Sequence, residues 1–255
     1  MAGCDTVFHM AANADVRRGL DDPSRDLNQN TIATFTVLEA MRAVGAKRIL
    51  FASSGSVYGE PEVTPTPEDC PFPEQTSLYG ASKLAGESLI QAYCEGYGFT
   101  GVILRFVSVL GERYTHGHLY DFTRALRDDP STLTVLGDGH QRKSYLYVGD
   151  CVEAIAMLAS CPDAPGSAVY NLGTDEVSDV DASVRAVTAH LGVSPRIAYT
   201  GGVRGWIGDS PLIHLDCSRL RGLGWRPRLT IAEAVGRTLD WLDANEWVFG
   251  ARVVR

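Results

Sequence analysis

Long apolar runs are missing from this sequence. No stretch of its 255 residues approaches the roughly 18 consecutive apolar residues that cross a membrane as a helix. Residues 1–5 carry neither the basic segment nor the apolar core of an export signal. We therefore expect a cytoplasmic protein with no membrane partner.

Cysteines at metal-ligand spacing are also missing. The six cysteines include no Cys-x-x-Cys pair and no Cys/His cluster of the kind that binds zinc. A chain of this length does not depend on a disulfide framework to fold. We expect reduced thiols and no bound metal.

Positive charge is scarce, because 23 Lys and Arg stand against 31 Asp and Glu, for a net charge of −8. Such a balance argues against nucleic acid or an anionic membrane as a partner, while a local pocket for one small anion is compatible with it. Hydrophobic residues make up 45% of the chain, enough for a full core in one large domain or two packed ones.

In the first half of the chain, short apolar runs alternate with amphipathic stretches. The order strand, helix, strand, loop, helix, strand is typical of a parallel sheet with crossover helices, so the predicted fold is α/β and doubly wound. Ligands of such sheets bind at the C-terminal ends of the strands. The predicted elements are strands at 6–12, 49–54 and 102–106 and helices at about 27–44 and 79–96.

The second half is less regular. Asp150 and Glu153 open an apolar run, which is typical of a capping box with Asp150 as the N-cap, and we interpret Asp150 as that cap rather than as a catalytic acid. The elements expected here are helices near 119–126, 181–191 and 231–244 and extended segments at 133–136, 145–148, 168–172 and 196–199.

Tyr79 and Lys83 are the strongest candidates for chemistry. They lie four residues apart on a predicted helix, so both side chains share one face. A lysine ammonium beside a phenol lowers the phenol's pKa, and a phenol tuned in this way can exchange a proton with a sugar hydroxyl near neutral pH. Ser54 ends the preceding strand, where its hydroxyl could share the reacting oxygen with Tyr79.

Several segments together resemble the extended short-chain dehydrogenase/reductase family, the NAD-dependent epimerases and dehydratases, and among these the UDP-sugar 4-epimerases. The central ones are Ser53-Ser54-Gly55-Ser56-Val57-Tyr58-Gly59 and Tyr79-Gly80-Ala81-Ser82-Lys83. The resemblance covers nearly the whole chain. The further matching segments are 9–12, 30–34, 105–108, 137–150, 170–173 and 223–227.

The resemblance implies a Rossmann-like parallel sheet that lacks its first strands and a smaller α/β substrate-binding domain. We expect residues 1–107 to form a partial dinucleotide-binding domain and 108–255 to be mainly the substrate domain, with 145–175 returning to the sheet. Gly55-Ser56 stands where the dehydratase branch carries an Asp-Glu pair, which disfavours 4,6-dehydration.

The implied mechanism is NAD-dependent epimerisation at C4 of a nucleotide sugar through a 4-keto intermediate. Tyr79 is the base for the sugar 4-OH, Ser54 orients that oxygen, and Lys83 binds the nicotinamide ribose and depresses the pKa of Tyr79. The implied cofactor-binding residues are Ala11, Ala12, Asn30, Ser53, Tyr79, Lys83 and Phe106. The implied substrate-binding residues are Ser56, Val107, Ser108, His118, Lys143, Arg204 and Asp209.

The family's Gly-x-x-Gly-x-x-Gly motif, which holds the cofactor pyrophosphate, has no counterpart ahead of residue 11, so we expect an N-terminally truncated chain. Glycines in 202–208 have similar spacing, but no amphipathic helix follows, and we interpret this segment as a substrate loop. Two alternatives stay open: a nucleotide-sugar keto-reductase and a non-catalytic remnant unable to retain cofactor. Relatives are often homodimers, and the sequence leaves the sugar and the base open.

Overall fold

A four-stranded parallel sheet is the centre of the fold in the computed structural model, which describes residues 3–72, 74–162 and 165–251. Its strand order is β1-β2-β3-β8, and every neighbouring pair is parallel. The strands are β1 (Thr6–His9), β2 (Arg48–Ala52), β3 (Thr100–Phe106) and β8 (Gly166–Leu172). The predicted α/β class with a parallel sheet is confirmed.

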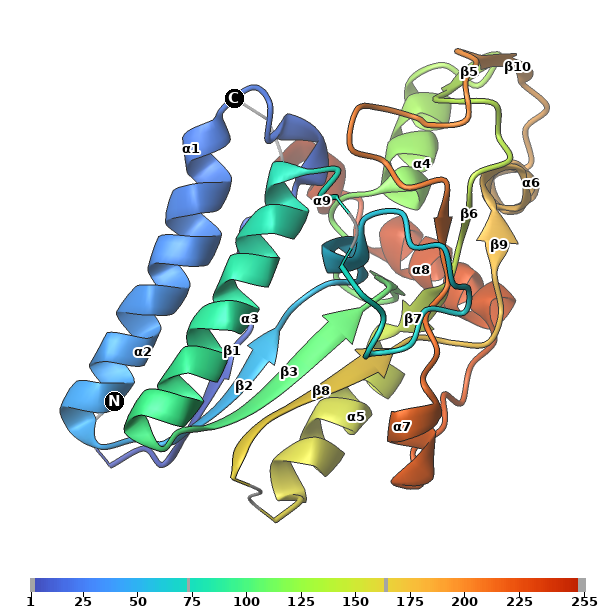
Figure 1. Cartoon of the computed structure of the whole chain (residues 1–255). Coiled ribbons are helices and arrows are strands. Elements are labelled where there is room, and N and C mark those ends of the chain that lie inside the picture. Colours follow the sequence, from blue (N-terminus) through green and yellow to red (C-terminus); the bar gives the residue numbers. More distant parts are fainter. Residues whose placement is uncertain (1–2, 73, 163–164, 252–255) are drawn as a thin grey trace.

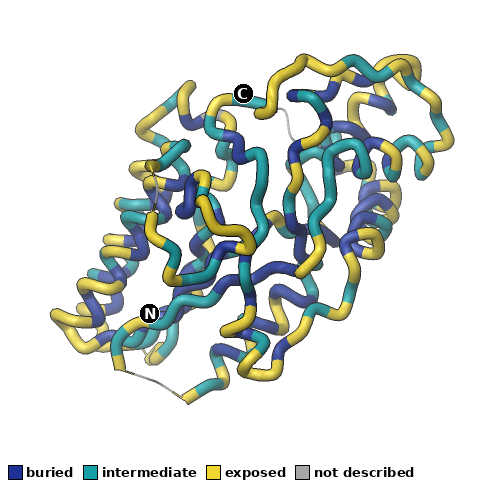
Figure 2. The backbone as a smooth tube through the Cα atoms, turned by 45° about the vertical axis from the view of Figure 1, so that its right-hand side comes forward, coloured by how far each residue is buried: buried dark blue, intermediate teal, exposed yellow. Residues whose placement is uncertain are grey.

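Helices cover both faces of this sheet, with α2 (Ala33–Val44) and α3 (Leu78–Tyr97) side by side on one face and α5 (Val148–Ser160) on the other (Figure 1). Successive residues of a strand point to opposite faces of the sheet, so β2 contributes apolar side chains to the helices on both faces. Ile49 and Phe51 pack into the core with α2 and α3, whereas Leu50 packs with α5. The buried residues follow the strands and the inner helix faces (Figure 2).

Residues before α2 are helical as well. They form η1 (Val16–Arg18), α1 (Pro23–Asp26) and the π-helical η2 (Leu27–Ile32), which continues directly into α2. The sequence predicted one helix over 27–44, and the structure divides it where the hydrogen-bonding period changes. The short η3 (Gly55–Tyr58) follows β2 and begins at Ser54, whose hydroxyl accepts from the Ser56 backbone N–H.

A second, smaller α/β group is inserted between β3 and β8 and continues after β8 (Figure 1). Side chains from α4, α6 and α8 and from β5 form its separate hydrophobic core. Its elements are β4 (Ser108–Leu110), α4 (His118–Asp128), β5 (Thr132–Val135), β6 (Arg142–Lys143), β7 (Tyr145–Tyr147), β9 (Ser178–Asp179), α6 (Val180–Leu191), β10 (Arg196–Tyr199), β11 (Leu212–Ile213), α8 (Ile231–Ala244) and α9 (Trp247–Ala251). The short α7 (Ser218–Gly222) packs on the main sheet instead, where Leu220 shares the core with Leu50. The division into domains at residue 107 stays a prediction.

Asp150 does not cap a helix, and that expectation was wrong. The helix α5 begins at Val148 with Tyr147 as its N-cap, so Asp150 lies inside the first turn. Its buried carboxylate instead accepts hydrogen bonds from the backbone N–H groups of Arg228 (3.0 Å) and Leu229 (3.2 Å). It thereby fixes the segment that leads into α8.

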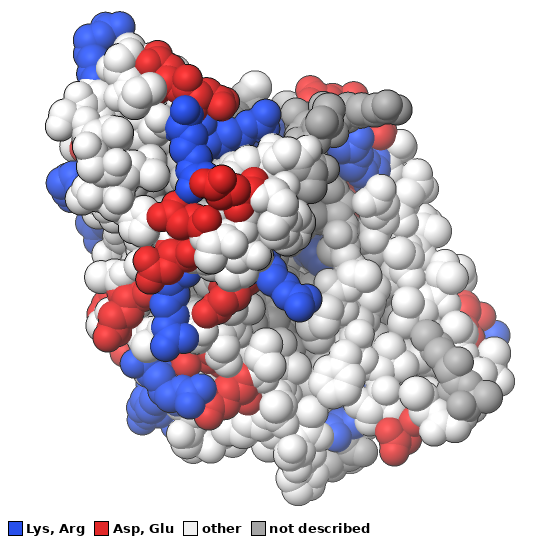
Figure 3. Space-filling model, turned by 180° about the vertical axis from the view of Figure 1, so that it is seen from behind, with Lys and Arg blue, Asp and Glu red and all other residues white. Residues whose placement is uncertain are grey.

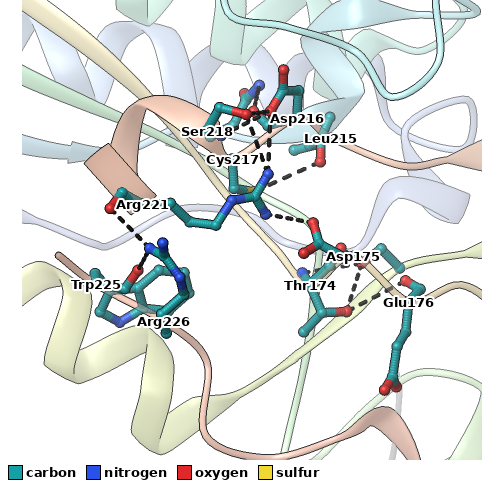
Figure 4. A network of polar contacts seen from close by, with 12 residues as sticks. Thr174, Asp175, Glu176, Leu215, Asp216, Cys217, Ser218, Arg221, Trp225 and Arg226 are labelled. Carbon is teal, nitrogen blue, oxygen red and sulfur yellow. Dashed lines mark hydrogen bonds and ion pairs between the residues drawn. The ribbon is translucent and has the colours of Figure 1, made fainter. Parts of the chain in front are cut away.

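Polar contacts of Arg221 tie α7 to the chain that follows β8 (Figure 4). Its guanidinium donates to Asp175 and, at 3.5 Å, to Asp216, while its carbonyl accepts from Arg226 at 2.8 Å. These contacts hold α7 against the segment that follows β8. None of the helices within the described residues has the length and apolar character needed to cross a membrane.

Candidate functional site

The C-terminal end of β2 is joined to one face of α3 by side chains placed four residues apart. Lys83 Nζ donates a 2.8 Å hydrogen bond to the Ala52 carbonyl. Ser54 hydrogen-bonds the Tyr79 phenol. Because residues i and i+4 share a helix face, the helix presents both groups to the same strand end. The structure thus brings together the three predicted catalytic residues.

Glu87, one further turn along α3, extends this pattern. Its carboxylate accepts a hydrogen bond from the Ser53 hydroxyl and forms a buried ion pair with Arg105 of β3, at 2.6 Å and 3.0 Å. Arg105 also donates to the Tyr58 hydroxyl at 2.7 Å. Ser53 is therefore held by the core, which fixes the backbone from which Ser54 projects.

Burial governs the protonation of the Tyr79–Lys83 pair. It raises the pKa of Tyr79, and the Ser54 hydrogen bond opposes this rise. Burial lowers the pKa of Lys83 to about 8, with Asp26 acting in the opposite direction. The sequence predicted that Lys83 depresses the pKa of Tyr79, but in this structure the direction for Tyr79 is upward because desolvation of the phenolate outweighs the favourable contacts.

The catalytic candidates line a cavity of about 690 Å³ between the sheet and the smaller group. This is within the range of small-molecule sites, roughly 300–1,000 Å³. Most of the predicted site residues share its wall. Those are Ala12, Ser53, Ser54, Ser56, Tyr79, Lys83, Phe106, Val107, Ser108, His118, Lys143 and Asp209.

Three predicted residues lie outside this lining. Ala11 is exposed at the end of β1, and Asn30 is buried behind the wall, where its amide donates to Ser82 Oγ at 2.9 Å. Arg204 is exposed and forms an ion pair with Glu60. Residues 200–211 form no helix or strand, as the sequence predicted for this segment.

At the side of the cavity formed by the smaller group, Lys143 and Asp209 form an ion pair at 2.5 Å. Asp209 is buried and also accepts from the Gly205 backbone N–H at 3.0 Å. The Lys143 ammonium lies 5.0 Å from the centroid of the Trp206 ring. The loop that carries Asp209 is thus anchored to β6 by a charged contact inside the cavity.

His118 begins α4 and lines the same cavity. Its Nε2 lies 2.9 Å from the Ser183 hydroxyl, and its ring is 5.1 Å from that of Tyr145. Burial, assisted by the charge of Lys143, lowers the pKa of His118 to about 3. The imidazole is therefore neutral at pH 7 and offers a hydrogen-bonding edge rather than a charge.

Sequence reasoning missed two parts of the cavity wall. Trp206 lines it, and its buried Nε1 has no hydrogen-bond partner within residues 3–72, 74–162 and 165–251. Arg17 and Asp121 also line it and form a 2.9 Å ion pair that joins η1 to α4. Arg17 follows the apolar strand β1 by a few residues. Because ligands of parallel sheets bind at the C-terminal strand ends, this position in the sequence could have predicted that Arg17 lies at the cavity.

The nicotinamide end of a dinucleotide fits the residues at the sheet side of the cavity. The Lys83 ammonium is held by one carbonyl, which leaves two of its three N–H groups for a ribose. Met10 and Ala12 extend the wall beyond β1, and Phe106, the last residue of β3, also lines it. These residues suit the flat ring and ribose of the expected cofactor.

Comparison with known proteins gives consistent matches. Residues 1–173 match the model of the NAD dependent epimerase/dehydratase family. A UDP-glucose 4-epimerase of Mycolicibacterium smegmatis is 31% identical over 243 residues, covering 93% of this chain and 75% of that protein.

Solved structures agree with the sequence matches. A crystal structure of a UDP-galactose 4-epimerase superposes with a TM-score of 0.85 at 39% identity, covering 96% of this chain and 79% of that one. The Thermus thermophilus UDP-glucose 4-epimerase in complex with NAD gives a TM-score of 0.82 at 33% identity, covering 94% and 78%.

Proposed function

This chain belongs to the NAD dependent epimerase/dehydratase family, and we propose on that premise that it epimerises a nucleotide sugar of the UDP-hexose type at C4. The reaction runs through transient oxidation of the sugar to a 4-keto intermediate, with NAD as the cofactor. The observation that carries the proposal is that Ser54, Tyr79 and Lys83 share the wall of one cavity.

Tyr79 acts as the base. Its phenolate takes the proton of the sugar 4-OH as the C4–H bond breaks, and the phenol returns a proton when the C4–H bond forms again on the opposite face. When bound, NAD supplies the acceptor and donor for the hydride in these two steps. The Ser54 hydroxyl, which already contacts the phenol, orients the reacting oxygen.

Lys83 binds the cofactor ribose with the N–H groups that its contact to Ala52 leaves available. Lys143, Asp209 and His118 belong to the substrate side of the cavity. The Lys143 ammonium can attract the phosphates of a sugar nucleotide as a point charge, but it lacks the bidentate hydrogen-bonding geometry of an arginine. Lys143 must release or share Asp209 when such a substrate binds, because the two are paired at 2.5 Å.

An assay with UDP-glucose tests the function and separates it from the keto-reductase alternative. With a trace of NAD, an epimerase forms UDP-galactose without net consumption of NAD(P)H, and Tyr79→Phe serves as the inactive control. Stoichiometric consumption of reduced cofactor would show a reductase instead. A folded chain that binds no NAD in a calorimetric titration would be the non-catalytic remnant.

We further propose a homodimer in the cytoplasm that binds no nucleic acid. Three large apolar side chains at or beside α2 are about half exposed: Ile32 at 47%, Phe35 at 45% and Val44 at 45%, which supports a helical contact between two copies. On the face in Figure 3, acidic and basic side chains alternate, which supports the absence of a nucleic-acid partner. Light scattering after size exclusion tests the dimer.

A further inference from the structure

A buried carboxylate lies behind the catalytic pair. Asp26 ends α1 and is 1% exposed. Its Oδ1 accepts hydrogen bonds from the side-chain amides of Asn13 (2.7 Å) and Asn30 (3.3 Å), whereas its Oδ2 is buried without a partner among the residues that the structure describes. A buried polar atom without a partner destabilises a folded protein, so its presence calls for an explanation.

The Asp26 cluster is connected to the helix that carries Tyr79 and Lys83. Asn30 donates to Ser82 Oγ at 2.9 Å, and Ser82 Oγ donates to the Tyr79 carbonyl at 2.8 Å. Since Asn30 also contacts Asp26, a continuous hydrogen-bond path runs from α1 through η2 to α3. Ser82 itself lies between the two catalytic residues in sequence, and its hydroxyl contacts Asn30 of η2.

Lys83 has an environment poor in compensating charge. It is 2% exposed, and its ammonium contacts one carbonyl and lies over the rings of Phe51 (5.1 Å) and Tyr79 (5.9 Å). Buried ammonium groups need a negative charge nearby to stay protonated. Asp26 acts on both members of the pair, raising the pKa of Lys83 against the effect of burial and raising that of Tyr79.

Resting on the proposed function, we propose that Asp26 is a positioning residue for the Tyr79–Lys83 pair: it anchors α3 through Asn30 and Ser82, and its carboxylate supplies the buried negative charge that keeps Lys83 an ammonium. Because a carboxylate oxygen without a donor is unfavourable to bury, the charge of Lys83 is the interaction that offsets the burial of Oδ2. A methyl group at Gly19 would lie 2.9 Å from Oδ2, so the backbone there closes this oxygen off from solvent.

Within the described part of the chain, few other titratable groups surround this cluster. Lys83 and Tyr79 face it from α3, and His9 on β1 is a neutralised neighbour whose pKa is lowered by burial and by Lys83. Within α1, Arg25 pairs with Asp22 at 3.8 Å. Asp26 is therefore a carboxylate whose charge acts on Lys83, and its removal changes the electrostatic environment of the ammonium.

The chain has only three lysines, Lys47, Lys83 and Lys143, so protein labelled with [ε-¹³C]lysine gives a simple NMR spectrum in which Lys83 can be titrated without cofactor or substrate. Asp26→Asn is expected to move the Lys83 midpoint to lower pH by about half a unit or more, leaving Lys47 and Lys143 in place. Ser82→Ala, which cuts the hydrogen-bond path and keeps the charge, is expected to leave the Lys83 midpoint unchanged.

An unchanged Lys83 midpoint in folded Asp26→Asn would overturn the proposal, and so would an equal shift in Ser82→Ala, because path geometry rather than charge would then control Lys83. If Asp26→Asn does not fold, the ¹³Cγ shift of Asp26 in the wild type decides: the proposal requires a carboxylate at pH 7, and a protonated acid overturns it. In active protein, Asp26→Asn also moves the acid limb of kcat to lower pH. Because the lysine titration needs no turnover, its failure is distinct from failure of the proposed function.

Discussion

The Lys83 ammonium lies 2.8 Å from the carbonyl oxygen of Ala52, at the point where β2 ends, and this contact fixes the position of α3 relative to the strand. The same contact draws a charged group into the core. Burial lowers the pKa of Lys83 from 10.5 to about 8, so the folded protein binds this proton less tightly than the unfolded chain does. The buried Lys83 ammonium therefore lowers the stability of the folded protein at neutral pH. The proposed reaction nevertheless requires this group.

Lys83→Met is expected to stabilise the cofactor-free protein at pH 7 by on the order of 2 kcal/mol while abolishing turnover. The gain follows because the folded-state pKa is depressed: the cost is fully present below about 8 and is relieved as the pH rises toward 10.5. Urea unfolding of both proteins between pH 7 and 10.5 measures the difference, which should shrink over that interval. A constant difference would refute the explanation.

Tyr79→Phe is expected to lower kcat by roughly 10²–10⁴-fold, because general acid–base catalysis contributes that range. The ring remains in the cavity wall, so binding of NAD and UDP-sugar should be retained in calorimetric titrations. Retained turnover in the variant would assign the base to another residue.

Ser54→Ala is expected to move the acid limb of the kcat–pH profile to higher pH. The Ser54 hydrogen bond lowers the pKa of Tyr79, so its loss raises that pKa and more alkaline conditions are needed to form the phenolate. Ser88→Ala, an exposed serine on the same helix, is the matched control and should keep the wild-type profile. If the acid limb of the kcat–pH profile of Ser54→Ala stays at its wild-type pH, Ser54 does not influence the protonation of Tyr79.

Lys143→Ala is expected to raise KM for the UDP-sugar about tenfold or more with a smaller change in kcat, because charge-assisted contacts to phosphate are worth roughly 1.5–3 kcal/mol. Arg142→Ala is the control, since the neighbouring side chain is exposed and lies outside the cavity lining. Equal effects of the two substitutions would point to general electrostatic attraction rather than to a contact in the cavity.

The sequence predicted the parallel α/β architecture and the helix face shared by Tyr79 and Lys83, because hydrophobic period and four-residue spacing are local signals. It did not predict the direction of the Tyr79 pKa, which depends on how deeply the assembled fold buries the phenol. Nor did it predict Trp206 in the cavity and Arg204 at its exterior, since a loop without regular structure gives no periodic pattern from which to orient its side chains.

The most direct test of the central claim follows the hydrogen at C4. UDP-glucose carrying deuterium at C4 is incubated with the protein and NAD in ordinary water, and the product is analysed by NMR. The account predicts UDP-galactose that retains the C4 deuterium, since the same hydride leaves and returns, and product formation by Tyr79→Phe that is slower by roughly 10²–10⁴-fold. Loss of the deuterium to solvent, or product formed without NAD, would contradict C4 oxidation and reduction at this site.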